Sequence, residues 1–214
     1  MINYKINYLE ESINNGGNIP NSVKVLLNNP LFSGVYGTIG SLIETDNEYS
    51  LAVSTSMGAS SNYLVVDDKK TASRMVDYLK NNKLGRATFF PLDVIKARYI
   101  DQDTIDKIKN MNGFTNRLDK ILRYDDKYSN VILNQFGCVI LVDNIDNANK
   151  ISSAINNKYK IVTLDGQLVN VGGSITGGDK VKSNDIIRQK YELEENKNKL
   201  NNLMNSNQDY LSII

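Results

Sequence analysis

One glycine-rich segment of the chain has a spacing that could hold a phosphate group. Gly172 and Gly177 stand five residues apart, as the first and last glycines of a phosphate-binding P-loop do. A P-loop continues with a lysine and a hydroxyl residue, whereas Gly178 and Asp179 take those places here. Because an aspartate at the hydroxyl position repels phosphate, the sequence disfavours nucleotide binding at this loop.

Residues suited to nucleophilic or metal-assisted catalysis are few. The chain has no histidine and one cysteine, Cys138, which excludes Ser-His-Asp and Cys-His catalysis, histidine-containing zinc sites and an internal disulfide. The acidic pairs Asp67-Asp68 and Asp125-Asp126 could in principle bind magnesium, but no base, nucleophile or phosphate loop stands near them. Turn and helix-cap roles are favoured for these acids. The sequence therefore predicts no catalytic residue, no metal site and no cofactor.

The glycines of the same segment fit a role in backbone contact better than one in phosphate binding. Glycine permits positive φ and lets another backbone approach where a side chain would clash. Val169, Val171 and Ile175 alternate with polar or small residues, as in a strand. A glycine-rich strand or turn at a sheet edge can press against the edge of a partner, whereas a flexible linker is the simpler alternative.

The elements that must position these residues are duplicated along the chain. Residues 46–53 are echoed 79 positions later by residues 125–132, and Leu64–Asp67 is echoed by Ile140–Asp143. The matches keep the same order in both copies. A repeat of this kind predicts two related subdomains.

Each copy has the same predicted order of helix, strand, helix and strand. Apolar residues at helical spacing mark the first helix, and Gly58 or Gly137 follows where a helix commonly ends. The alternation is typical of α/β architecture. The predicted elements are 48–57, 63–66, 69–82 and 87–90 in the first copy, and 127–136, 138–142, 145–157 and 160–163 in the second.

Both ends of the chain carry heptad-like apolar stripes. Ile2, Ile6 and Leu9 follow heptad spacing at the start, and Ile186 and Leu193 stand seven residues apart near the end. Because stripes this short are unstable alone in water, we expect them to pair with each other, antiparallel. Two unrelated amphipathic helices packed on the domain are the alternative. The predicted segments are an N-terminal arm at 1–21, subdomains at 22–110 and 111–182, and a C-terminal arm at 183–214.

The charge of the chain alternates along its length. The 25 lysines and arginines nearly balance the 24 acids, and the net charge of +1 excludes a uniformly basic nucleic-acid binder. Residues 69–109 still carry ten bases against five acids, and residues 150–190 seven against three. These blocks are either solvated faces or parts of one basic patch. No apolar run approaches the roughly 20 residues of a membrane span, and the first residues lack the apolar core of a signal peptide, so a soluble cytoplasmic protein is expected.

Four strings together resemble the hinge domain of structural maintenance of chromosomes (SMC) proteins. They are Leu31-Phe-Ser-Gly-Val-Tyr-Gly-Thr-Ile-Gly40, Gly85-Arg-Ala-Thr-Phe-Phe-Pro91, Val162-Thr-Leu-Asp-Gly166 and Gly172-Gly-Ser-Ile-Thr-Gly-Gly178. The resemblance runs from about residue 22 to 180 and is strongest for the bacterial condensin-type SMC, and the flanking heptads match the hinge-proximal arms. Two positions depart from the family pattern: Val171 stands where proline is usual, and Gln167 where an acid is common.

The resemblance implies an α/β (α+β) fold of two pseudo-symmetric subdomains and a doughnut-like homodimer. Each subdomain is expected to meet the other subdomain of the partner through sheet edges. The arms are expected to leave as an antiparallel coiled coil toward ATPase heads outside this chain. Such a hinge is not itself an enzyme and serves chromosome condensation and segregation. The residues expected at the dimer contact are Gly172, Gly173, Gly177 and Gly178.

DNA is the second partner that the resemblance implies, bound through basic surface near the arms. Binding would be directed at the phosphate backbone, strongly salt-dependent and without sequence specificity. The candidate DNA-binding residues are Lys180, Lys182, Arg188 and Lys190, with Lys69, Lys70 and Arg74 as further contributors. Two other interpretations stay open: a two-lobed α/β protein that binds a nucleotide or small ligand, and a DNA-binding protein in which dimerisation is incidental.

Overall fold

The structure, a computed structural model, describes residues 1–14, 19–178 and 186–211. The chain divides into two compact units: Met1–Asn18 together with Ser183–Ile214, and Ile19–Lys182. Each unit is described by itself. The division of the larger unit at residue 110 stays a prediction.

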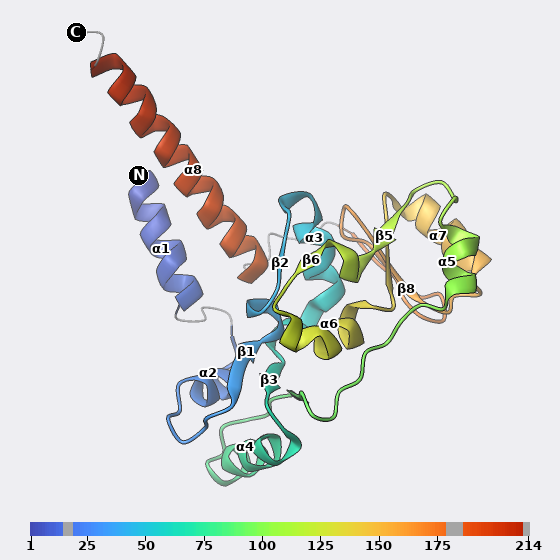
Figure 1. Ribbon diagram of the computed structural model, residues 1–214, viewed down its shortest axis with the longest axis horizontal. Coiled ribbons are helices and arrows are strands. Elements are labelled where there is room, and N and C mark those ends of the chain that lie inside the picture. The colour runs from blue at the N-terminus through green and yellow to red at the C-terminus, as the bar shows by residue number, and fades with distance from the viewer. Residues whose placement is uncertain (15–18, 179–185, 212–214) are drawn as a thin grey trace. The chain divides into compact units, whose positions relative to one another are not determined.

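The smaller unit is a pair of helices, α1 (Ile2–Asn14) and α8 (Ile186–Leu211), which run antiparallel (Figure 1). Ile6, Leu9 and Ile187 are its buried apolar residues. Ile6 and Leu9 lie in the predicted N-terminal stripe, whereas Ile187 is the neighbour of the predicted Ile186, which is half-buried. The two helices pack on each other through these apolar residues. The antiparallel pairing of the two ends is confirmed.

The larger unit begins with a three-stranded sheet and two helices: α2 (Asn21–Leu27), β1 (Val35–Thr38), β3 (Leu64–Val66), α4 (Lys69–Asn81) and β4 (Phe89–Pro91). The strand order is β1-β3-β4, with β1 antiparallel and β4 parallel to the central β3. Leu26 from α2 and Met75 from α4 are fully buried against Leu64 of β3. The sheet is therefore held by one apolar cluster that both helices share.

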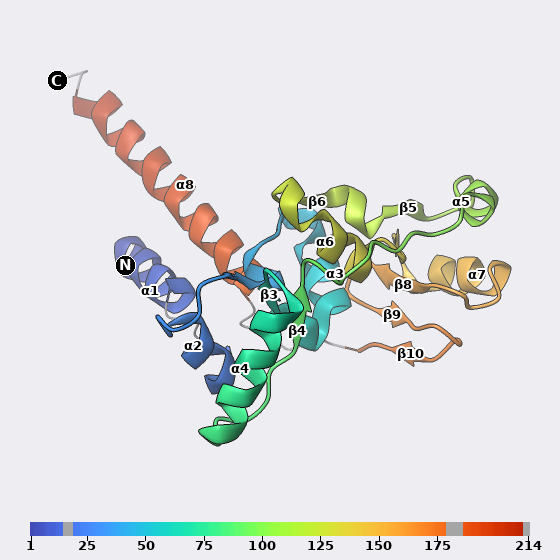
Figure 2. The ribbon, with the colours of Figure 1, turned by 60° about the horizontal axis from the view of Figure 1, so that its bottom comes forward.

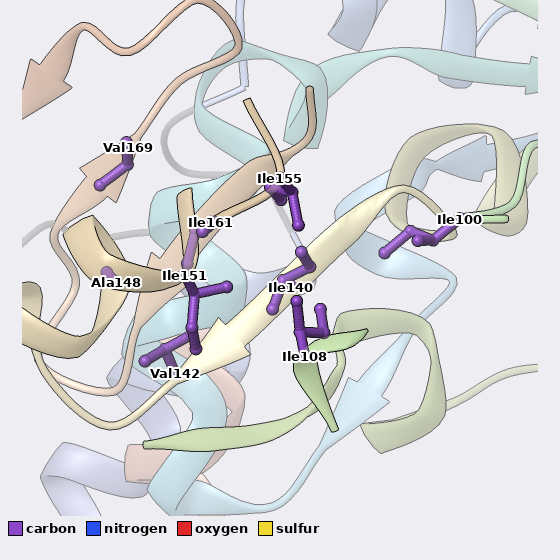
Figure 3. Packing of buried hydrophobic residues seen from close by; sticks show 9 residues of the cluster. All are labelled: Ile100, Ile108, Ile140, Val142, Ala148, Ile151, Ile155, Ile161 and Val169. Carbon is purple, nitrogen blue, oxygen red and sulfur yellow. The ribbon is translucent and has the colours of Figure 1, made fainter. Parts of the chain in front are cut away.

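The second half of this unit has five strands and two helices: α5 (Gln102–Ile108), β5 (Phe114–Arg117), β7 (Val139–Val142), α7 (Ile145–Ala154), β8 (Lys160–Thr163), β9 (Leu168–Val169) and β10 (Ile175–Thr176). The strand order is β10-β9-β8-β7-β5, and β7 and β8 are the parallel pair. Figure 3 shows the core of this half, in which Ile108, Ile140, Ile151 and Ile161 are fully buried. All four residues of β7 are buried, as expected for a strand covered on both faces.

Shorter elements complete the unit: η1 (Ile39–Ser41), β2 (Glu44–Thr45), α3 (Asn47–Met57), η2 (Gly58–Asn62), η3 (Leu118–Ile121), β6 (Leu122–Arg123), η4 (Asp126–Tyr128) and α6 (Ser129–Phe136). Strands β2 and β6 pair antiparallel, with Glu44 opposite Arg123. These two residues are 79 positions apart, which is the offset of the sequence repeat. A local two-fold axis therefore passes through this pair and relates the two copies.

The duplication extends further than the echoed segments. Asp67 N–H donates to Gly34 O (2.9 Å), and Asp143 N–H donates to Gly113 O (3.0 Å). Both glycines have positive φ, and a Cβ on either would overlap the carboxylate of its partner aspartate. Each first strand also has an irregular register at the same relative place. The two copies thus share their local backbone geometry.

One acid of each acidic pair caps a helix. Asp68 Oδ1 accepts from Thr71 N–H (2.6 Å) at the start of α4, and Asp125 Oδ1 accepts from Lys127 N–H (3.0 Å) at the start of η4. These hydrogen bonds hold the pKa of both carboxyls below its ordinary value. The predicted cap role of these acids is confirmed.

Candidate interface at an open sheet edge

The glycine-rich segment forms the hairpin β9–β10 at the edge of the five-stranded sheet (Figure 2). In β10, Ile175 lies opposite Val169 and Thr176 opposite Leu168. The sequence pattern indicated one strand through Val171, whereas this residue lies in the turn between two strands of two residues each. Among the described residues no strand covers the outer side of β10.

Apolar side chains are exposed along this open edge. Val171 is 64% exposed and Ile175 is 56% exposed. An open strand presents unpaired N–H and C=O groups to other chains, and proteins usually protect such edges with charged residues. No charged residue stands between Gln167 and Gly178. The hairpin therefore has the properties of a strand-pairing surface.

Gly172 and Gly173 make the turn of the hairpin. Their φ angles are 85° and 92°, in the left-handed region that glycine adopts without strain. A Cβ on Gly172 would have no described atom within 4 Å, whereas a Cβ on Gly173 would lie 3.3 Å from the side chain of Asn157. The surface beside Gly172 is thus open, whereas Gly173 leaves room for the side chain of Asn157.

Gly177 and Gly178 follow β10 directly. Gly178 has a φ of 125° and no described atom within 4 Å of an added Cβ, whereas a Cβ on Gly177 would lie 2.1 Å from Gln167 Oε1. The structure therefore brings the four predicted glycines together on one hairpin. Their contact with a partner stays a prediction, and Gly172 and Gly178 are the two that face open space.

The turn is supported by Asn157, which the sequence analysis did not identify. Gly172 N–H donates to Asn157 O (2.9 Å), and Asn157 N–H donates to Ser152 O (2.8 Å). Asn156 and Asn157 both have a φ of 53°, which ends α7 at Ala154 and makes the predicted end at residue 157 wrong. The Asn-Asn pair was an available signal, because asparagine tolerates the left-handed region better than most residues.

The string Val162–Gly166 fixes the base of the hairpin. Thr163 N–H donates to Gln167 O (2.9 Å), and Gln167 N–H donates to Thr163 Oγ1 (2.8 Å). A Cβ on Gly166 would lie 3.0 Å from Leu51 Cγ in α3. The turn therefore packs closely on a helix of the first copy, which accounts for a glycine at this place.

Side-chain hydrogen bonds at two places hold the second half of the larger unit in position. Lys160 Nζ donates to Ser56 O (3.3 Å) at the end of α3, and burial lowers the pKa of this lysine. Asp101 Oδ2 accepts from Lys158 Nζ (2.8 Å) and from Tyr159 Oη (2.7 Å). These hydrogen bonds, that of Lys158 first, hold the pKa of the Asp101 carboxyl well below its ordinary range. The start of α5, at Asp101, is thereby bound to the residues that directly precede β8.

Strand β4 is a second open edge. It pairs with β3 alone in the described part of the chain, and Pro91, which has no N–H, suits an edge strand. In the duplicated fold β4 corresponds to β8, because each is parallel to the central strand. β8 is covered by β9, whereas no described strand covers β4. A groove lined in part by Tyr63, Ala87 and Thr88 lies at the start of this edge.

Three of the predicted DNA-binding residues lie on α4. Lys69 and Lys70 are exposed in its first turn. Arg74 is also exposed, but its Nη2 donates to Leu31 O (3.3 Å) and its guanidinium lies 5.7 Å from the centre of the Phe32 ring. Arg74 therefore has a structural role as well, and the two lysines are the better candidates for phosphate contacts.

Of the other four predicted DNA-binding residues, the structure describes two. Arg188 and Lys190 are on α8, where Arg188 Nε lies 3.6 Å from Glu192 Oε1. Lys180 and Lys182 lie outside the described residues. A single patch formed by all seven residues stays a prediction.

Residues 1–14, 19–178 and 186–211 contain neither a candidate metal site nor a membrane span. This part of the chain has no group of three or more acidic or cysteine residues that could hold a metal ion. It also has no helix that is both long and apolar enough to cross a membrane. Burial raises the pKa of the Cys138 thiol, which makes this residue a poor nucleophile.

A sequence profile described as SMC proteins Flexible Hinge Domain matches residues 32–152. The chain belongs to the SMC hinge family. The resemblance inferred from the four strings is therefore confirmed. The SMC hinge of Geobacillus stearothermophilus, solved as an asymmetric dimer, is 32% identical with a TM-score of 0.85, over 96% of this chain and 83% of that one. The hinge of Pyrococcus furiosus is 26% identical with a TM-score of 0.64, over 86% and 94%. These matches confirm the predicted α/β hinge fold.

The curated relatives of this SMC hinge are much longer proteins. The chromosome partition protein Smc of Mesomycoplasma hyorhinis is 33% identical over 196 residues, which are 91% of this chain and 20% of that protein. The Smc protein of Bacillus subtilis is 36% identical over 163 residues, 76% of this chain and 14% of that protein. The hinge thus spans a fifth or less of the length of these relatives.

Proposed function

We propose that this SMC hinge is a homodimerisation module whose contact is made by the open edge of β10. The observation that carries the proposal is the edge itself, which has no charged residue and exposes Val171 and Ile175. Gly172 and Gly178 add surface without side chains beside it. The dimeric state of the Geobacillus stearothermophilus hinge supports the proposal.

Strand β4 of the partner is the proposed receiver of β10. It corresponds to β8 of the second half, but no strand of the described residues pairs with it as β9 pairs with β8. Each chain then offers one donating and one receiving edge, and a two-fold axis between the copies forms both contacts at once. Such a dimer covers both open edges, and a stable one buries on the order of 800 Å² per partner.

The biological role that we propose is to join the two coiled-coil arms of a chromosome partition protein. The names of the relatives support this role. The antiparallel helices α1 and α8 are suited to be the bases of one arm. Chemistry would then be carried out by other parts of the longer protein, and the hinge would act in the cytoplasm, on the nucleoid.

An auxiliary DNA contact is the second part of the proposal. Lys69 and Lys70 are exposed on α4, where lysines can contact the phosphate backbone whatever the base sequence. Lys180, Lys182, Arg188 and Lys190 are further proposed phosphate contacts, the last two on α8.

The mass of the hinge in solution tests the dimer. We expect sedimentation velocity to show a dimer at micromolar concentration and a folded monomer for Ile175→Lys. The new ammonium group is solvated in the monomer, whereas burial in a strand contact without a partner costs several kcal/mol, about a hundredfold or more in the dissociation constant. Circular dichroism checks that the variant is folded.

The matched control is Val76→Lys, because Val76 is an apolar residue on α4 that is 49% exposed. This variant has the same change in charge and should remain dimeric. A monomeric wild-type hinge at these concentrations would refute the proposal, and a dimeric Ile175→Lys variant would refute the assignment of the contact to β10.

A further inference from the structure

The side chain of Gln167 pairs with the backbone of the residue that ends the hairpin. Gly178 N–H donates to Gln167 Oε1 (2.8 Å), and Gln167 Nε2 donates to Gly178 O (3.4 Å). A carboxamide offers one carbonyl acceptor and N–H donors, as a peptide unit does. Gln167 therefore replaces one residue of a neighbouring strand, at a point beyond the last backbone pair of the hairpin, Leu168 with Thr176.

Gly177 provides the space for this pairing. A Cβ on Gly177 would lie 2.1 Å from Gln167 Oε1 and 3.2 Å from its Cδ. The φ of Gly177 is not in the left-handed region, unlike those of Gly172, Gly173 and Gly178. Backbone conformation therefore does not require glycine here, but the Gln167 amide does.

We infer that Gln167 is a positioning residue of the dimer edge, which holds Gly177 and Gly178 in line with β10. The inference rests on the proposed function, since the edge matters only if a partner pairs with it. The ordered edge of β10, Ile175–Thr176, is thereby extended by two residues, Gly177 and Gly178. An edge that is ordered before contact loses less conformational entropy on pairing, which favours the dimer.

The chemistry at residue 167 distinguishes its two hydrogen bonds. In Gln167→Glu the carboxylate keeps the acceptor for Gly178 N–H but has no donor for Gly178 O. In Gln167→Ala both hydrogen bonds are lost and the space beside Gly177 becomes free. A role in positioning thus predicts a graded loss of dimer affinity, with Gln167→Glu between wild type and Gln167→Ala.

Two measurements test the inference. The first is the dimer dissociation constant of Gln167→Ala, Gly177→Ala and the double variant. We expect each single variant to weaken the dimer by about tenfold, because Gly177 and Gly178 then lose their conformational freedom only on pairing with the partner. The double variant should be no weaker than Gln167→Ala, because the added methyl group then enters free space. Gln102→Ala, which removes an exposed amide on α5, is the control and should leave the constant unchanged.

The second measurement is hydrogen exchange at the Gly178 amide in the Ile175→Lys background, where a partner cannot protect it. Gln167→Ala should accelerate this exchange by about tenfold, because the amide loses its acceptor. Additive effects of the two single variants on the dissociation constant, or unchanged exchange at Gly178, would overturn the inference while leaving the dimer intact. A monomeric wild-type hinge would instead overturn the proposed function, and the positioning role with it.

Discussion

Glycines in equivalent places of the two repeats are required for different physical reasons. Gly58 and Gly137 follow α3 and α6, and the two positions are 79 residues apart. Gly58 has a φ of 50°, and a Cβ there would have no described atom within 4 Å. Gly137 has a φ of −65°, but a Cβ on it would lie 2.1 Å from Arg98 O. Gly58 is thus needed for its backbone angle, and Gly137 for the space beside a carbonyl group.

Alanine substitutions at these two glycines should therefore have unequal effects. Gly58→Ala should lower the free energy of unfolding by about 1–2 kcal/mol, because a residue with a Cβ rarely adopts the backbone angles of Gly58 (φ 50°, ψ −127°). Gly137→Ala should lower it by about 3 kcal/mol, because backbone atoms around Arg98 must shift to relieve the overlap. Urea denaturation of both variants measures the difference. Equal losses would contradict the assignment of Gly137 to close packing.

At the scale of single residues, the sequence located the candidate site but not the role of each residue in it. The spacing of Gly172, Gly173, Gly177 and Gly178 identified the hairpin segment. The spacing could not show that Gly177 leaves room for the Gln167 side chain, since that depends on a contact between residues ten positions apart. For the same reason the departure at Gln167 was visible as a difference from the family pattern, while its two hydrogen bonds were not.

At the scale of elements, long periodic segments were predictable and short ones were not. Helix α4 begins at Lys69 as predicted, and β8 covers Lys160–Thr163 as predicted. Strand β1 was missed because Gly37 interrupts it and its register is irregular. Helices of seven residues, such as α5, are too short to show a hydrophobic period. The two-residue strands β9 and β10 have no period either, so tertiary pairing alone defines them.

Cross-linking between elements can establish which edge receives β10. We consider two variants in a Cys138→Ser background, Thr176→Cys in β10 and Thr88→Cys just before β4, both at exposed threonines. If β10 pairs with β4 of the partner, a short bifunctional thiol reagent should give a covalent dimer only when the two variants are mixed. Gel electrophoresis under reducing conditions measures the product.

The separate samples are the controls of this experiment. A covalent dimer of Thr176→Cys alone would indicate that two β10 edges pair with each other across a two-fold axis. That result would leave the dimer in place and contradict the role of β4. A cross-link in neither the mixed nor the separate samples, with a dimer present, would exclude both edges from the contact.

At the scale of the larger unit, the value of the duplication lies in where the two copies differ. The local two-fold axis at Glu44 and Arg123 relates a three-stranded sheet to a five-stranded one. In the proposed dimer, the extra hairpin gives one copy a strand to donate, and the other copy, which has no such hairpin in its described residues, offers an edge to receive it. A perfect duplication would have covered or exposed both edges alike. Divergence of one copy would therefore supply the complementary edges of the proposed homodimer.

DNA binding is a property of the whole charge distribution, and paired charge reversals test it. Lys69→Glu with Lys70→Glu on α4 changes the net charge by the same amount as Lys107→Glu with Lys109→Glu at the C-terminal end of α5. If α4 binds phosphates, the first pair should lower the slope of log affinity against log salt by about 2, at roughly 0.9 for each phosphate that a lysine no longer neutralises.

The pair on α5 separates direct phosphate binding from net charge. Lys109 is already paired with Asp106 (2.7 Å), and Lys107 Nζ donates to Ala154 O, so both lysines have partners within the protein. Their reversal weakens long-range attraction as much as reversal on α4 does, but removes no proposed phosphate ligand, so the slope should stay close to that of wild type. Fluorescence anisotropy with a short labelled duplex, over a series of salt concentrations, measures all three slopes. Equal slopes for the two double variants would reduce the role of α4 to its charge alone, whereas a change confined to the α4 pair would locate the phosphate-binding lysines on that helix.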